Sequence, residues 1–134
     1  MSPTSPVPEA REIHAPLRIL IVEDHPVITL ALKVALEGMG EEVVGQAVDA
    51  AGVRGLDLLG VDLAFVDVNL ADGPTGPAIA AQLVERGVSV VFHTSNPEAI
   101  PADFTQAVGV LEKPSTLTGL AQAIQLARLG LSRR

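Results

Sequence analysis

The sequence contains no cysteine, no tryptophan and no tyrosine, and only three phenylalanines. The lack of cysteine excludes disulfide bonds and thiolate metal sites, and it is compatible with a reducing compartment. Basic residues are also few: nine lysines and arginines face 16 acidic residues, for a net charge of -7 and a pI of about 4.8. A surface that neutralises nucleic-acid phosphates needs clustered lysine and arginine, so we expect no nucleic-acid partner.

Long apolar runs are missing as well. No stretch of the sequence approaches the roughly 18 apolar residues that a membrane helix needs. The first 16 residues lack the basic start and apolar stretch of a signal peptide. We therefore expect a cytoplasmic protein without a membrane segment. Residues 1–16, which are rich in proline and polar residues, have too little apolar material to pack and are predicted to form a disordered tail.

The chain does have enough apolar residues for one domain. It is 134 residues long and 48% hydrophobic, so it can bury a substantial core without disulfide bonds. A second domain of ordinary size does not fit. We place the single predicted domain at residues 17–131.

Within this domain, apolar runs alternate with helical patterns. The runs predicted to be strands cover residues 17–22, 42–47, 61–66, 88–93 and 108–111. The helical patterns cover residues 26–38, 49–59, 78–86 and 115–129, with Pro26 in the first turn of the first helix and Asp49 as a cap of the second. This alternation predicts an α/β fold, a doubly wound five-stranded parallel sheet with helices on both faces.

A further helix is expected after Asn96, between the last two strands, but the pattern weakens there. Pro97 can begin a helix. Pro101 cannot lie inside one without removing a hydrogen bond and clashing with the preceding turn. We therefore expect this fourth helix to be short, kinked or mobile.

Polar residues follow four of the predicted strands at the point where each strand ends. They are Glu23 and Asp24, Asp67, Thr94 and Lys113. Because ligands of open parallel sheets bind beyond the carboxyl ends of the strands, these side chains are predicted to converge. A single aspartate at a strand end is usually a solvated loop residue, whereas five suitable residues at one edge indicate a functional site.

The residue types at this edge suit phosphoryl chemistry. Clustered carboxylates bind a hard divalent cation, and Mg²⁺ takes one or two protein carboxylates while keeping several waters. Asp67 is then the candidate nucleophile, because a carboxylate that attacks phosphorus forms an acyl phosphate. Lys113 can supply positive charge to the phosphoryl oxygens, and Thr94 a hydroxyl that turns toward them.

With these residues the chain resembles the receiver domains of two-component response regulators, over about residues 17–130. The motifs that carry the resemblance are Val22-Glu23-Asp24-His25-Pro26, Val66-Asp67-Val68-Asn69, Thr94 and Lys113-Pro114. The resemblance implies a flavodoxin-like sheet with strand order 2-1-3-4-5. Residues 69–73 and 92–97 are more similar to alphaproteobacterial receivers of general-stress phosphorelays.

The resemblance also implies a role for each site residue. Asp67 accepts a phosphoryl group from a sensor histidine kinase. Magnesium is held by Glu23, Asp24, Asp67 and the backbone carbonyl of Asn69. Lys113 binds the phosphoryl group, and Thr94 couples phosphorylation to a shift of the fourth helix and fifth strand.

The sequence departs from the family pattern at two positions. Many receivers have an aromatic residue three positions before the lysine, where it rotates inward as the threonine moves. Here that position is Val110, so an aromatic switch cannot operate there. Pro101 interrupts the fourth helix, which suggests that output comes from ordering or displacement of this segment.

Three other residues near the motifs have simpler interpretations. His25 is expected to be a solvated loop residue that precedes Pro26. His93 is expected to be a partly packed neighbour of the site, with modulation of Thr94 as the alternative. Lys33 is expected on the solvated face of the first helix, which is also the face where this family commonly meets its kinase.

Two alternative functions stay open for the sequence. A phosphatase that uses Asp67 as a transient nucleophile would usually have a second acid two residues later, where this chain has Asn69. We therefore do not expect an enzyme beyond self-phosphorylation and autodephosphorylation. A phosphorylation-independent interaction module is favoured by Val110 and opposed by the complete set of site residues.

The sequence ends soon after the last predicted helix, at Ser132-Arg133-Arg134. We therefore expect a stand-alone receiver that acts through other proteins: a sensor histidine kinase, and a phosphotransferase or a downstream regulator. The apolar spacing of the last helix suits either core packing or pairing with a second copy. We expect a monomer or a weak homodimer.

Overall fold

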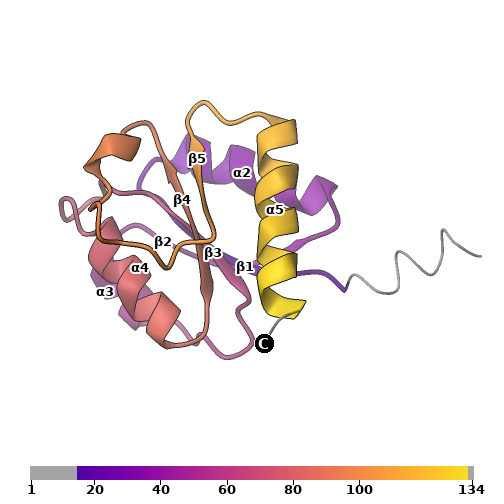
Figure 1. Ribbon diagram of the computed structural model, residues 1–134, viewed down its shortest axis with the longest axis horizontal. Coiled ribbons are helices and arrows are strands. Elements are labelled where there is room, and N and C mark those ends of the chain that lie inside the picture. Colours follow the sequence, from indigo (N-terminus) through magenta and orange to yellow (C-terminus); the bar gives the residue numbers. More distant parts are fainter. Residues whose placement is uncertain (1–14, 133–134) are drawn as a thin grey trace, which may run out of the picture.

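The computed structural model describes residues 15–132 (Figure 1). His14 and most of the predicted tail, residues 1–14, lie outside this range. Arg128 Nη1 donates a hydrogen bond of 2.9 Å to the carbonyl of Ala15, and the backbone N–H of Leu17 donates one of 2.8 Å to Glu41. Leu17, at 4% exposure, is the first buried residue of the described chain. Within residues 15–132, no helix is long and apolar enough to cross a bilayer.

The core of the fold is one parallel sheet of five strands in the order β2-β1-β3-β4-β5. The strands are β1 (Arg18–Val22), β2 (Glu42–Ala47), β3 (Leu63–Val66), β4 (Ser89–Thr94) and β5 (Gly109–Glu112). The predicted α/β class and strand order are confirmed, with strand limits shifted by one or two residues. For example, β3 begins at Leu63 because the backbone N–H of Val61 donates to Leu58 in a turn.

Four α-helices flank the sheet within the described residues: α2 (Pro26–Gly38), α3 (Ala50–Arg54), α4 (Gly76–Glu85) and α5 (Leu117–Ser132). Pro26 occupies the first turn of α2, as predicted. Asp49 caps α3, since its side chain accepts a 2.8 Å hydrogen bond from Gly52 N. The expected extension of α3 to residue 59 is wrong. Gly55 follows the last turn of α3, and glycine is a poor helix former.

The fourth helix, which was expected to be short, kinked or mobile, is indeed short and is not an α-helix. Residues 95–108 contain only a short 3₁₀ helix, η1 (Pro97–Ala99). Ile100 has the extended conformation, with φ of -71° and ψ of 128°, which is the conformation that a following proline favours. Pro101 therefore stops the helix after one turn, and the rest of this segment reaches β5 without regular structure.

The two faces of the sheet carry separate helix layers (Figure 1). Leu20 and Val22 of β1 pack with side chains from α3 and α4, whereas Ile19 and Ile21 pack with α2 and α5. Successive residues of a strand face opposite sides, so a strand between two helix layers must be apolar throughout. This arrangement explains the continuous apolar runs and leaves the carboxyl edge of the sheet for the polar residues.

Candidate functional site

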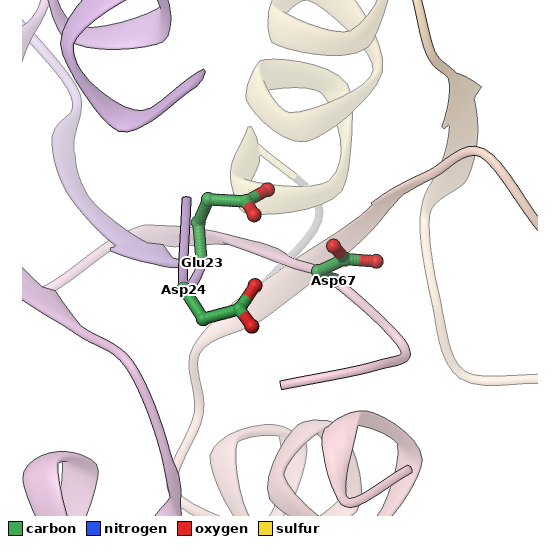
Figure 2. Close-up of side chains that lie close together, drawn as sticks. All are labelled: Glu23, Asp24 and Asp67. Carbon is green, nitrogen blue, oxygen red and sulfur yellow. The ribbon is translucent and has the colours of Figure 1, made fainter. Parts of the chain in front are cut away.

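Three carboxylates converge at the carboxyl edge of the sheet (Figure 2). Val22 and Val66 are register partners at the ends of β1 and β3, so Glu23 and Asp67 leave the sheet at the same level. Asp24 follows Glu23. One oxygen from each carboxylate lies within 4.8 Å of the others. Three hard oxygen ligands at this spacing fit a divalent cation such as Mg²⁺.

The carboxylates differ in their exposure to solvent. Glu23 is 3% exposed and Asp67 is 7% exposed, whereas Asp24 is half-buried. A hollow of about 350 Å³ opens beside Glu23 and Asp24, against the start of α2. Solvent and ions therefore reach the cluster from the Asp24 side.

Lys113, in the loop after β5, joins the carboxylates across the sheet edge. Its Nζ lies 2.7 Å from Glu23 Oε1 and 2.8 Å from Asp67 Oδ2. Burial alone would lower the pKa of Lys113, but the hydrogen bonds and negative charges of Asp67 and Glu23 outweigh it and raise that pKa. Lys113 is therefore fully charged at neutral pH and offsets the repulsion between the two buried carboxylates.

Burial has the opposite effect on Glu23. It raises the pKa of the Glu23 carboxyl, and the hydrogen bonds from Lys113 and from the backbone N–H of His25 offset this only in part. Glu23 is thus held by two donors, of which only Lys113 carries a full charge. His25 itself is exposed, as expected of a loop residue.

Both carboxylate oxygens of Asp67 are hydrogen-bonded. Oδ1 accepts a 2.7 Å bond from Val68 N, and Oδ2 accepts the bond from Lys113. The loop under Asp67 is packed so closely against Gly76 that a Cβ at Gly76 would overlap the carbonyl oxygen of Asp67. The backbone N–H of Gly76 also donates a 3.0 Å bond to Val68 O. Gly76 therefore positions the Asp67 loop.

The sequence alone gave Gly76 no such role, because the run from Gly73 to Pro77 has the composition of an ordinary turn. A signal was present in its spacing. Gly76 lies nine residues after Asp67 at the first position of α4, where the chain must return to the strand end.

Thr94 is the last residue of β4 and is 1% exposed. Its Oγ1 accepts a 3.0 Å hydrogen bond from Asn96 N, and its carbonyl accepts a 3.0 Å bond from Lys113 N. Thr94 is thus linked through the backbone to the residue that contacts Asp67. Its hydroxyl hydrogen is free to rotate, since the bond to Asn96 uses the oxygen as acceptor.

Asn69 lies in the bend after Asp67 and is exposed. The loop beyond it is closed by backbone bonds between Leu70 and Gly73 in both directions, of 2.8 and 3.0 Å. Asn69 therefore lies in the exposed loop two residues beyond Asp67, whereas the other predicted site residues lie at or directly after the strand ends.

His93, next to Thr94, is 4% exposed and more deeply packed than the sequence suggested. Its Nε2 lies 3.3 Å from Ser115 Oγ. Burial, together with the charge of Lys113, lowers the pKa of His93 to about 4, against an opposing effect of Asp67. The imidazole is therefore neutral at neutral pH and links β4 to the loop that carries Lys113.

Known proteins are similar to this chain in sequence and fold. A family profile for the response regulator receiver domain matches residues 19–125. The phyllosphere-induced regulator PhyR of Methylorubrum extorquens is 35% identical over 94 residues, which cover 66% of this chain and 35% of PhyR. The matched region thus spans only about a third of the length of that relative.

Solved structures are similar over most of the chain. The receiver domain of PhyR from Erythrobacter litoralis has a TM-score of 0.77 at 24% identity, and the match covers 86% of this chain and 92% of that one. SdrG from Sphingomonas melonis has a TM-score of 0.70 at 33% identity, with coverage of 85% and 98%. The expected similarity to alphaproteobacterial receivers is confirmed, and PhyR proteins are among these relatives. Because the family profile matches well over half of its length, the protein belongs to the response regulator receiver domain family.

Proposed function

We propose that this protein accepts a phosphoryl group on Asp67 from a sensor histidine kinase, in a Mg²⁺-dependent reaction, and signals or relays it through contact with other proteins. The observation that carries the proposal is the contact of Lys113 with both Glu23 and Asp67, in a cluster that brings Asp24 within metal-ligand reach. A nucleophile, acidic metal ligands and a fixed cation lie together at one accessible edge.

In the proposed step, a carboxylate oxygen of Asp67 attacks the phosphorus of a phosphohistidine. The new O–P bond forms an acyl phosphate. The P–N bond breaks, and its electron pair stays on the imidazole nitrogen of the donor, which is then protonated by solvent. No oxidant or further reactant is required, so the step depends mainly on positioning and on charge stabilisation.

The residues around Asp67 have separate roles in this step. Glu23, Asp24, Asp67 and the Asn69 carbonyl would hold Mg²⁺, which supplies positive charge against the phosphoryl oxygens. Lys113 is already hydrogen-bonded to Asp67 and needs only a small movement to donate to a phosphoryl oxygen. Thr94 can donate its hydroxyl hydrogen to another phosphoryl oxygen once its side chain turns toward Asp67.

The first helix is the proposed docking surface for the kinase. Val27, Leu30 and Val34 of α2 are 79%, 60% and 61% exposed and share one helix face by their spacing. Leu30 and Lys33 also line the hollow that opens at Glu23 and Asp24. A partner that covers this face would bring its phosphohistidine beside the carboxylate cluster. Contact of this kind would take place in the cytoplasm, where sensor kinases have their catalytic parts.

One alternative retains a supporting observation. The ion pairs of Lys113 offset part of the charge of Glu23 and Asp67 without any phosphoryl group, which suits an interaction module that no longer uses phosphate. The phosphatase alternative has no such support, since Asn69 is not an acid.

The proposal is tested by incubation with Mg²⁺ and acetyl phosphate, or with a phosphorylated kinase, followed by mass spectrometry of the intact protein. We expect a gain of one phosphoryl group that needs Mg²⁺ and is abolished by Asp67→Asn. No gain in the wild-type protein would support the interaction module. Rapid turnover of small phosphoesters would instead support the phosphatase.

A further inference from the structure

Residues 95–108, the segment that replaces the expected fourth helix, are attached to β4 near both ends. At the start, the backbone N–H of Asn96 donates to Thr94 Oγ1 over 3.0 Å. Further along, the ring of Phe104 packs against Phe92 in an edge-to-face arrangement, with centroids 5.1 Å apart and planes at 75°. Phe92 and Thr94 are two residues apart on one strand, so both attachments lie on the same face of β4.

Phe104 differs from the other aromatic residues of the chain. Phe65 and Phe92 lie within strands and are 1% and 0% exposed. Phe104 is half-buried and belongs to a segment without regular structure. Few backbone hydrogen bonds restrain such a segment, so its position depends on a small number of side-chain contacts.

The neighbour of Phe92 on β5 leaves space for this ring. Phe92 and Val110 are register partners, so their side chains project from the same face of the sheet. Val110 is 52% exposed and has no ring of its own to cover Phe92. Phe104 thus supplies an aromatic contact over β4 that the edge strand does not provide.

A hollow lies on the other side of Phe104. It has a volume of about 370 Å³ and is lined by α4 residues Ala78, Ala81 and Val84 and by Pro101 and Phe104 of the segment. Glu85, Asp103 and Gln106 also line it, so its lining combines small apolar side chains with polar ones. Phe104 already borders this hollow, and the apolar side chains of α4 offer its ring a second set of contacts.

We propose that Phe104 is the positioning residue through which phosphorylation of Asp67 changes the surface of the protein. This inference rests on the proposed phosphorylation. When the Thr94 side chain turns about χ1 so that its hydroxyl reaches the phosphoryl oxygen, its Oγ1 moves away from Asn96 N, and the segment loses its first attachment. The Phe104 ring then moves from Phe92 into the hollow beside α4, and residues 97–104 are displaced with it.

The geometry favours movement of the whole segment over a change confined to Thr94. The segment is also held at its end by the bond from Val108 N to Val90 O, and Ile100 and Ala107 pack against the core in addition to Phe104. The Asn96 bond is the attachment at the start of the segment, so its loss frees residues 97–104 to shift while Val108 stays bonded to β4. Phosphorylation can shift the conformation only if some contact differs in free energy between the phosphorylated and unphosphorylated protein. Here that contact is the hydrogen bond from Asn96 N to Thr94 Oγ1.

Fluorine NMR tests this inference directly, because the chain has only three phenylalanines. The full chain is labelled with 4-fluorophenylalanine, and the Phe104 signal is assigned with Phe104→Leu. Spectra are recorded with Mg²⁺, before and after addition of acetyl phosphate. Intact-mass measurement of the same sample records the phosphorylated fraction. Phe65 is the internal control, since it packs on the opposite face with α2 and α5.

We expect the Phe104 signal to shift or split in proportion to the phosphorylated fraction, while the Phe65 signal keeps its position. Thr94→Val, which preserves side-chain shape but removes the hydroxyl, should still gain mass but lose the Phe104 response. Thr94→Ser, which keeps the hydroxyl, should retain both the mass gain and the Phe104 response. A phosphorylated wild-type protein with an unchanged Phe104 signal, or a full response in Thr94→Val, would overturn the role of Phe104 alone. No mass gain would overturn the proposed phosphorylation and this inference with it.

Discussion

Lys113 and Glu23 are 90 residues apart in the chain, yet Lys113 Nζ lies 2.7 Å from Glu23 Oε1. The side chains are 13% and 2% exposed, so the pair is largely shielded from solvent. The sequence motifs led us to expect Lys113 beside the phosphoryl group of Asp67. Its contact with Glu23 adds that the same ammonium neutralises a proposed metal ligand. We therefore expect Mg²⁺, if it binds at the proposed site, to compete with Lys113 for Glu23.

This competition predicts how Mg²⁺ affects a lysine variant. Lys113→Met leaves two buried carboxylates without their cation, and we expect it to lower the free energy of unfolding by about 3 kcal/mol. Mg²⁺ should recover more stability in Lys113→Met than in the wild-type protein, because no ammonium has to leave Glu23. Thermal unfolding with and without Mg²⁺ measures both effects.

Lys33, the only other lysine, supplies the matched control. It lies on α2 outside the ion-pair cluster, so Lys33→Met should change the unfolding free energy by no more than about 0.5 kcal/mol. An equal Mg²⁺ effect in wild type and Lys113→Met would show that Lys113 and the metal do not compete.

The metal ligands make a second prediction. Asp24→Asn removes a charged ligand, and we expect it to weaken Mg²⁺ binding by about tenfold or more. Asn69→Ala should bind Mg²⁺ nearly as well as wild type, because the proposed ligand is a backbone carbonyl that the substitution keeps. Mg²⁺ titration followed by NMR chemical shifts gives both affinities. A large loss in Asn69→Ala would assign the ligand to the side chain instead.

Gly76 makes a third prediction, because no side chain fits beneath Asp67. Gly76→Ala forces the backbone of Asp67 and α4 apart, and overpacking of this kind costs about 1–3 kcal/mol. We also expect slower phosphorylation, since the carboxylate is displaced. Gly38→Ala is the control, because nothing lies within 4 Å of a Cβ at the end of α2. Urea unfolding measures the stability of the two variants, and the rate of mass gain measures their phosphorylation. Equal stability and equal phosphorylation rates in Gly76→Ala and Gly38→Ala would refute the prediction.

A fourth prediction concerns the pH dependence of folding stability and rests on His93. Its pKa falls from 6.5 to about 4 on folding, so the neutral form is favoured in the folded state. Its contribution to stability is complete above pH 6.5 and is lost as the pH falls toward 4, by up to about 3 kcal/mol. His93→Gln should therefore lose less stability than wild type between pH 7 and 4.5. Denaturant unfolding at the two pH values measures the difference, and identical losses would contradict it.

Much of the site could be predicted from sequence because the reasons are local. Val22 and Val66 end buried strands, and parallel topology alone brings the residues that follow them to one edge. The cap at Asp49 and the proline at the start of α2 were equally local signals. Pro101 correctly indicated a weak fourth helix, although not that only one 3₁₀ turn would form.

Other features depend on contacts between distant segments and left no clear pattern. The role of Gly76 comes from the return of α4 to the Asp67 loop, and the packing of Phe104 on Phe92 comes from a segment with no periodicity. The early end of α3 could not be predicted, because the sequence pattern did not show whether Gly55 would end the helix or be tolerated inside it. Sequence patterns indicate where strands end, but they do not show which distant loop packs against a strand end.

The central claim is that Asp67 becomes an acyl phosphate, and reductive trapping tests it at the level of the residue. Borohydride reduces an aspartyl phosphate to homoserine with release of phosphate, whereas a free carboxylate does not react. After incubation with Mg²⁺ and a phosphodonor, peptide mapping should find homoserine at position 67 and at no other carboxylate, and none when Mg²⁺ is removed. A phosphorylated Glu23 would be reduced to hydroxynorvaline instead of homoserine, and a phosphorylated Asp24 to homoserine at position 24, so peptide mapping distinguishes both from Asp67. A modified residue other than Asp67, or none at all, would contradict the account.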